Sequence, residues 1–119
     1  MRGNLKSKSI VSNKISLLEA IRKIDVNKGG VLFLVDQKGH LKGSLSDGDI
    51  RRGLLTKNLN LDSAAILAAN VTPKCLRIGT LGGLKNDSQL PFPVLDSQDR
   101  VVDIINSSKE INIGERVIG

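Results

Sequence analysis

The residues best suited to chemistry lie between Leu41 and Leu55, in the stretch LKGSLSDGDIRRGLL. Asp49 is an acceptor-only carboxylate that can take two hydroxyl donors from a vicinal diol, and Ser46 precedes it by three residues. A helix starting here would offer free backbone N–H groups to a phosphate, and Arg51 or Arg52 could reach an anionic oxygen. The stretch is therefore a candidate ligand site.

The same residues also form a helix cap. Ser46 and Asp49 have the spacing of a variant capping box, in which each side chain accepts the backbone N–H of the other, a cap that contributes about 0.5–2 kcal/mol. Acidic residues in the first turn are favourable in any helix because they face its positive end. The cap and the ligand site do not exclude one another, and both interpretations stay open.

Hydrophobic patterns predict the elements that position this stretch. Ser16 and Glu19 form a second capping-box pattern at the start of an amphipathic helix, which the Gly29-Gly30 pair should end. VLFLVD is a continuous apolar run typical of a buried strand, and QKGH is a turn. The predicted order is a strand at 9–11, a helix from 17, strands at 31–36 and 41–46, and a helix from 47.

The second half of the chain repeats part of this pattern. A shift of 60 residues aligns LFLVDQKGHLKG with FPVLDSQDRVVD, which places Asp36 on Asp96 and Leu41 on Val101. A helical turn in AAILAAN and strands in KCLRI, PFPVLD and VVDII are expected. The connection before PFPVLD is about seven residues shorter than its counterpart, about two helical turns, and Gly82-Gly83 disfavours a helix within it. We therefore expect a shortened second repeat.

This pattern resembles the cystathionine-β-synthase (CBS) domain, in the tandem form called a Bateman module. VLFLVDQKGHLKGSLSDGDIRRGLL carries the whole pattern of one domain, and the second copy carries it weakly. The resemblance implies an α+β fold of two β-α-β-β-α repeats related by a pseudo-two-fold axis. The expected divisions are 1–60 for the first repeat with its N-terminal arm, 61–109 for the shortened second repeat, and 110–119 for a tail.

The resemblance also implies a regulatory module that binds an adenosine-containing ligand and needs no cofactor. AMP, ADP, ATP or S-adenosylmethionine would be that ligand. Asp49 would accept the ribose hydroxyls, Ser46 would face the sugar and phosphate, and Ile10 and Val11 would line the adenine. Because Asp103, Asn106 and Lys109 replace Gly43, Ser46 and Asp49 in the second copy, at most one such site per chain is expected.

Two further similarities suggest which enzyme is regulated. The tail EINIGERVIG resembles the segment that opens the barrel domain of sialic acid synthases, and SDGDIRRGLL is similar to CBS pairs fused in front of sugar nucleotidyltransferases. A downstream catalytic domain for surface-sugar (nonulosonic or sialic acid) biosynthesis is thus one expectation. The tail could equally complete the second repeat's sheet as a strand. A homodimer is expected. A structural or oligomerisation module with an empty cleft is the alternative from another class.

Composition argues against several other functions. The net charge of +6 comes from scattered Lys and Arg, and the absence of Trp and Tyr disfavours nucleic-acid binding. Cys75 and His40 are single residues that cannot build a zinc site, and no nucleophile motif or phosphate-binding glycine loop predicts an enzyme. The first residues lack the apolar core of a signal peptide and no run of about 18 apolar residues occurs, which favours the cytoplasm over a membrane.

Overall fold

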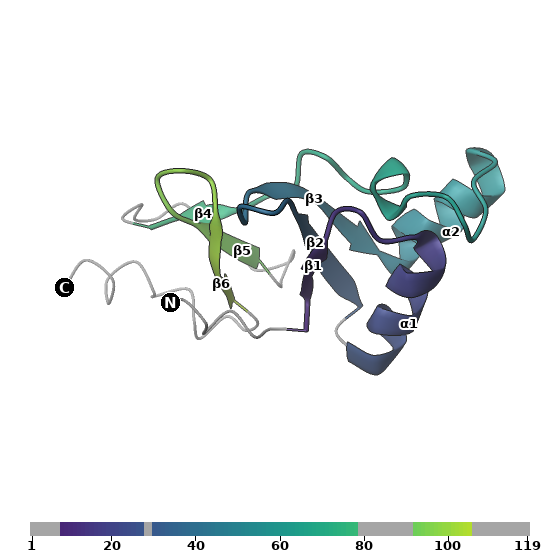
Figure 1. Cartoon of the computed structure of the whole chain (residues 1–119), viewed down its shortest axis with the longest axis horizontal. Helices are drawn as coiled ribbons and strands as arrows, with labels where there is room; N and C mark the ends of the chain where they lie inside the picture. The colour runs from purple at the N-terminus through teal and green to yellow at the C-terminus, as the bar shows by residue number, and fades with distance from the viewer. Residues whose placement is uncertain (1–7, 28–29, 79–91, 106–119) are drawn as a thin grey trace.

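The computed structural model describes residues 8–27, 30–78 and 92–105, which form two three-stranded sheets and two α-helices arranged in layers (Figure 1). The first sheet lies between the helices and the second sheet. The elements in order are β1 (Ile10–Ser12), α1 (Leu17–Asn27), β2 (Val31–Val35), β3 (Leu41–Ser46), α2 (Asp47–Thr56), a 3-10 helix (Ala65–Leu67), β4 (Leu76–Arg77), β5 (Phe92–Leu95) and β6 (Val101–Ile105).

The two sheets have the same topology, which confirms the α+β fold and the internal repeat. In each sheet the first strand runs parallel to the second and the second antiparallel to the third, in the orders β1-β2-β3 and β4-β5-β6. Val35 pairs with Leu41 after a register shift, and Leu95 pairs with Val101 after the same shift. These pairs lie 60 positions apart, as the sequence alignment predicts.

The two helices cover one face of the first sheet because both are amphipathic. Ser16 and Glu19 cap α1 reciprocally, with each backbone N–H donating to the other side chain at 3.2 Å, and the helix ends at Asn27, before the predicted glycine pair. The core on this face consists of Val11, Ile15, Leu17, Ala20, Leu32, Leu34, Leu45, Ile50, Ala65 and Ala68. Ala65 and Ala68 come from beyond the expected boundary at residue 60 and pack on the first repeat.

The opposite face of the first sheet packs on the second sheet. Phe33 from β2 lies in one buried cluster with Leu95, Val101 and Ile104 from β5 and β6. The hairpin turns join the sheets as well: Leu41 donates its N–H to the Asp99 carbonyl at 3.1 Å, and Val101 donates to the Gly39 carbonyl at 2.9 Å. The two bonds are equivalent: the donors Leu41 and Val101 are 60 positions apart, and so are the acceptors Gly39 and Asp99. Each repeat therefore contacts the other in the same way, as expected for a pseudo-two-fold axis.

The second repeat is shorter, but by less than the sequence suggested. Paired residues Val11 and Leu34 are 23 positions apart, whereas Leu76 and Val94 are 18 apart, so five residues are missing rather than seven. The β4 strand covers only two residues of KCLRI. The predictions on Gly82-Gly83 and on the tail lie outside the described residues. Neither described helix has the length and apolar composition to cross a membrane.

Candidate ligand pocket at the start of helix α2

A pocket of about 160 Å³ lies where β2 and β3 meet the start of α2 and the segment after the 3-10 helix. Its floor is partly apolar, because alternate residues of β2 face this side of the sheet. Hydroxyl, carboxylate, amide and ammonium groups surround that floor. The described lining residues are Val31, Phe33, Ser44, Ser46, Asp49, Asn70, Pro73 and Lys74.

Ser46 ends β3 and is the N-cap of α2. Its backbone is extended, and its hydroxyl accepts the Asp49 N–H at 3.1 Å while Asp49 Oδ2 accepts the Ser46 N–H at 2.9 Å. The predicted capping box is therefore confirmed. The Ser46 hydroxyl also donates to Asp49 Oδ2 at 3.0 Å, so one carboxylate oxygen of Asp49 receives two bonds from the cap.

The second oxygen of Asp49 faces a different partner. Arg52 Nη2 donates to Asp49 Oδ1 at 2.7 Å, across one helical turn. The carboxylate is 19% exposed and the Arg52 side chain 67% exposed, so Arg52 approaches from solvent. A carboxylate has about four acceptor positions, and these bonds occupy three of them. One acceptor position of Oδ1 is left without a bond among the described residues.

The basic residue at the pocket is Lys74, which the sequence analysis did not identify. Of the two arginines that were predicted as alternatives to reach an anion, Arg51 bonds to Asp47 Oδ2 at 2.6 Å on the exposed side of α2, Arg52 bonds to Asp49, and neither is among the described lining residues of the pocket. Lys74 lines the pocket and forms no ion pair with any residue that the structure describes. It is therefore the cation placed to meet an anionic group here.

Lys74 reaches the pocket because its segment adds to the edge of β3. Ser44 and Asn70 exchange two backbone hydrogen bonds, at 2.9 and 2.8 Å, as an isolated antiparallel bridge. Gly43 permits this approach: a Cβ at that position would lie 3.0 Å from the Asn70 carbonyl oxygen and 3.2 Å from the Ala69 Cβ. Glycine is disfavoured inside a strand unless another backbone approaches closely, so Gly43 is the sequence signal that could have indicated the packing of residues 69–70 against β3.

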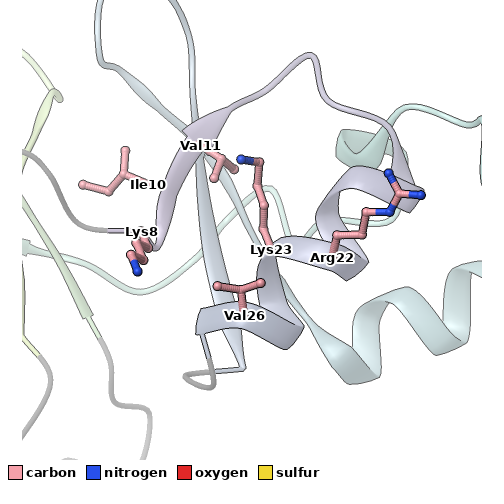
Figure 2. Close-up of a pocket in the computed structure, with 6 residues that line it drawn as sticks. All are labelled: Lys8, Ile10, Val11, Arg22, Lys23 and Val26. Carbon is pink, nitrogen blue, oxygen red and sulfur yellow. The ribbon is translucent and has the colours of Figure 1, made fainter.

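Ile10 and Val11 do not lie in this pocket. Ile10 pairs with Phe33, which in turn pairs with Ser44, so Ile10 is on the same sheet face but one strand away from the lining residues. Val11 points to the helical face and is buried in the first core. Both residues line another pocket, of about 320 Å³, beside α1 (Figure 2).

At the described positions, the second repeat carries an apolar residue where the first has Ser44. Sixty positions after Phe33 and Ser44 stand Pro93 and Ile104, and both are buried. Ile104 packs into the cluster between the sheets. Asp103 pairs with Val94 in the position of Gly43, where any side chain would block a segment packed as closely as 69–70. Asn106 and Lys109 lie outside the described residues.

No protein-family model and no curated protein matches the sequence. Structural comparison finds Staphylococcus aureus OpuCA at a TM-score of 0.65 and 20% identity, over 90% of this chain and 91% of OpuCA. CbpB in complex with c-di-AMP has a TM-score of 0.67 and 11% identity, over 92% of this chain and 77% of CbpB. CBSX2 in complex with AMP has a TM-score of 0.63 and 16% identity, over 92% and 89%, and another structure describes CBSX2 as a CBS-pair protein from Arabidopsis thaliana. The chain has the fold of a CBS-domain pair.

Proposed function

We propose that the chain is a cytoplasmic regulatory module that binds an adenine nucleotide in the pocket at the start of α2 and modulates a fused or associated enzyme. The observation that carries the proposal is the convergence of Asp49, Ser46 and Lys74 on one pocket with an apolar floor. CbpB and CBSX2, which share the fold, are described with c-di-AMP and AMP bound. Each of these ligands contains an adenosine and a phosphate.

The polar groups of the pocket match the parts of such a ligand. The free acceptor position of Asp49 Oδ1 would take a ribose hydroxyl, and Lys74 would meet the phosphate. Val31 and Phe33 offer an apolar surface to the base, with Ile10 one strand further along the same face. Arg52 is exposed and bonded to the same carboxylate, so it would release Asp49 when the ribose binds.

Regulation follows from differential binding. Phe33 lines the pocket and also packs in the buried cluster between the two sheets. A nucleotide that binds better to one packing of this cluster favours that packing by the difference in affinity, and by no more. The regulated enzyme is proposed to be a sialic acid synthase or a sugar nucleotidyltransferase, a proposal supported by the sequence similarities of the tail and of SDGDIRRGLL. Assays of either enzyme with and without the chain and nucleotide would test that part separately.

Binding itself is tested by calorimetry with AMP, ADP, ATP and S-adenosylmethionine. Asp49→Asn keeps a polar side chain but removes the charge, and it is expected to weaken binding about tenfold or more, since bonds to a charged acceptor contribute about 1.5–3 kcal/mol. Asp47→Asn is the matched control, because Asp47 lies in the same helical turn, pairs with Arg51 and does not line the pocket. Absence of heat with all four ligands, or equal losses for both variants, would overturn the proposal.

An oligomerisation module with an empty pocket is the second candidate. It is favoured by the exposure of large apolar side chains, among them Val26, Leu55, Leu67 and Val71, which a second subunit could cover. The bonds that Asp49 already makes to Ser46 and Arg52 also satisfy most of its acceptor capacity without a ligand. Sedimentation analysis separates the candidates: a homodimer that binds none of the four nucleotides supports this one, and a monomer at high concentration excludes it.

A further inference from the structure

A second pocket lies at the outer edge of the first sheet, between β1 and α1 (Figure 2). It has a volume of about 320 Å³, within the range of small-molecule sites. Its described lining residues are Lys8, Ile10, Val11, Arg22, Lys23 and Val26. None of these residues lines the pocket at the start of α2, so the two pockets are separate sites.

The interior of this pocket is apolar. Val11 comes from β1, which is the edge strand of its sheet, and Val26 in the last turn of α1 lies on the same side, whereas the Ile10 side chain points to the other side of β1 (Figure 2). Val26 is 65% exposed, whereas Leu17, Ala20, Ile21 and Ile24 of α1 lie in the core or pack against it. A valine on the solvent side of an otherwise amphipathic helix leaves apolar surface that a ligand can cover.

Three cationic side chains line the pocket, and their charged ends point in different directions (Figure 2). Arg22, Lys23 and Val26 share one flank of α1, because residues three and four positions apart are neighbours on a helix. Lys8 precedes β1 on the other side of the pocket. None of the three cations forms an ion pair within the described part of the chain. Glu19, one turn earlier on α1, accepts the Ser16 N–H in the helix cap.

We propose that this pocket binds a small amphiphilic anion, an apolar chain or ring that carries a phosphate or carboxylate group. The apolar part lies on Val11 and Val26 at the edge of β1, and the anionic group meets Lys23 or Arg22 on the same helix as Val26. A fully polar anion lacks the contact with the apolar residues, and a neutral apolar molecule leaves the cations without a partner. Recognition of both parts together distinguishes this pocket from a merely basic surface.

Octyl phosphate is a probe that carries both an apolar chain and an anionic group. Octanol, which has only the chain, and methyl phosphate, which has only the anionic group, are its controls. In an NMR titration of the isotope-labelled chain, millimolar octyl phosphate is expected to shift the backbone amides of Ile10, Val11 and Val26. Each control alone should shift them much less at the same concentration. Sodium octanoate in place of octyl phosphate distinguishes carboxylate from phosphate recognition. The proposal is overturned if the pocket amides do not move, or if they move only where octyl phosphate forms micelles.

Charge-matched variants separate the site from the overall basic charge. The double variant Arg22→Gln and Lys23→Gln is expected to weaken octyl phosphate binding about tenfold, whereas Lys38→Gln with Lys57→Gln removes the same net charge from exposed positions elsewhere and should leave it unchanged. Val26→Ser tests the apolar contact at an exposed position that folding does not require. Equal losses in the two double variants would mean that the probe senses only net charge, and would refute the site.

Discussion

Val101 donates its backbone N–H to the carbonyl oxygen of Gly39 at 2.9 Å and so joins the hairpin turn of the first sheet to β6 of the second. The mirror bond runs from Leu41 to Asp99 at 3.1 Å. Gly39 adopts a φ of +91°, and Asp99, at the equivalent position, a φ of +67°. The joint between the repeats therefore depends on two residues in the left-handed region of backbone conformation.

Gly39→Ala is expected to destabilise the fold by about 1–2 kcal/mol, because an L residue in this conformation is strained. Space does not forbid the methyl group, whose nearest neighbour would be Arg100 at 3.9 Å. Gly48→Ala is the control: Gly48 lies within α2, where alanine is the better helix former, and the added Cβ would meet the flexible end of Arg52 at 3.4 Å and the Ser46 hydroxyl at an ordinary contact distance of 3.8 Å. Urea denaturation should show a loss for the first variant and no loss for the second.

The two helix caps allow stability and binding to be separated. Ser46→Ala and Ser16→Ala each remove a reciprocal cap and should each cost about 1 kcal/mol of unfolding free energy in urea denaturation. Only Ser46 lines the pocket at the start of α2. Ser46→Ala should therefore weaken nucleotide binding in calorimetry and Ser16→Ala should not, and parallel losses of affinity would refute a contact with the ligand.

Acid is expected to lower the free energy of unfolding through the two hairpin turns, between the unfolded pKa of their aspartates and a pH of about 2. Burial raises the pKa of Asp36, but hydrogen bonds from the His40 and Lys38 backbone N–H groups and from the His40 ring lower it overall to about 2. The backbone N–H of Arg100 likewise lowers the pKa of Asp96. A carboxyl group whose folded pKa lies below its unfolded value of about 4 stabilises the fold above that value and loses this effect as the pH falls toward 2.

A matched variant checks that acid effect. In Asp36→Asn with Asp96→Asn, the unfolding free energy should depend less on pH between about 4 and 2 than in the unchanged chain, because neither position titrates. Carbon-detected NMR titration of the two carboxyl groups measures the pKa values directly. Parallel stability curves for both proteins would contradict the assignment of acid sensitivity to the turns.

Cys75 should react slowly with thiol reagents while the chain is folded. Burial raises the pKa of its thiol, and the Arg77 charge opposes this effect while the Asp99 charge adds to it. Because the thiolate is the nucleophile, labelling by dithiobis-nitrobenzoate near pH 8 should be slow in buffer and fast in guanidinium chloride. The raised pKa also means that this residue stabilises the fold less as the pH rises above the ordinary thiol pKa. Equal labelling rates in the two solvents would contradict the burial of the thiol.

Local patterns predicted the first repeat closely because each of its elements carries its own signal. Two capping boxes, an amphipathic helix and an apolar strand run specified α1, β2 and the start of α2 without reference to distant residues. The 60-residue repeat then predicted the second hairpin, with Asp96 aligned on Asp36. The structure adds that Asp96 accepts the Gln98 and Arg100 N–H groups as Asp36 accepts those of Lys38 and His40. His40, the last residue of the predicted QKGH turn, bonds to Asp36 through its ring at 3.0 Å.

The pocket was less predictable because half of it comes from distant residues. Ser46 and Asp49 lie close in sequence and were identified together, whereas Asn70 and Lys74 reach the pocket only through the bridge between Ser44 and Asn70. That bridge has no local sequence pattern apart from Gly43. The family resemblance placed Ile10 and Val11 at the same ligand as Asp49. In the structure, Ile10 lies one strand away from the pocket, and Val11 points to the opposite face of the sheet because side chains alternate along a strand.

Phe33 belongs to two environments: it lines the pocket at the start of α2 and packs in the buried cluster between the two sheets. A protein interior packed at crystal-like density has no slack around such a ring, so a molecule that presses on it from the pocket side must displace Leu95, Val101 or Ile104 on the other. If the proposed nucleotide binds there, the aliphatic side chains of the second repeat would move with Phe33, and the core of that repeat would respond to whether the pocket of the first repeat is filled.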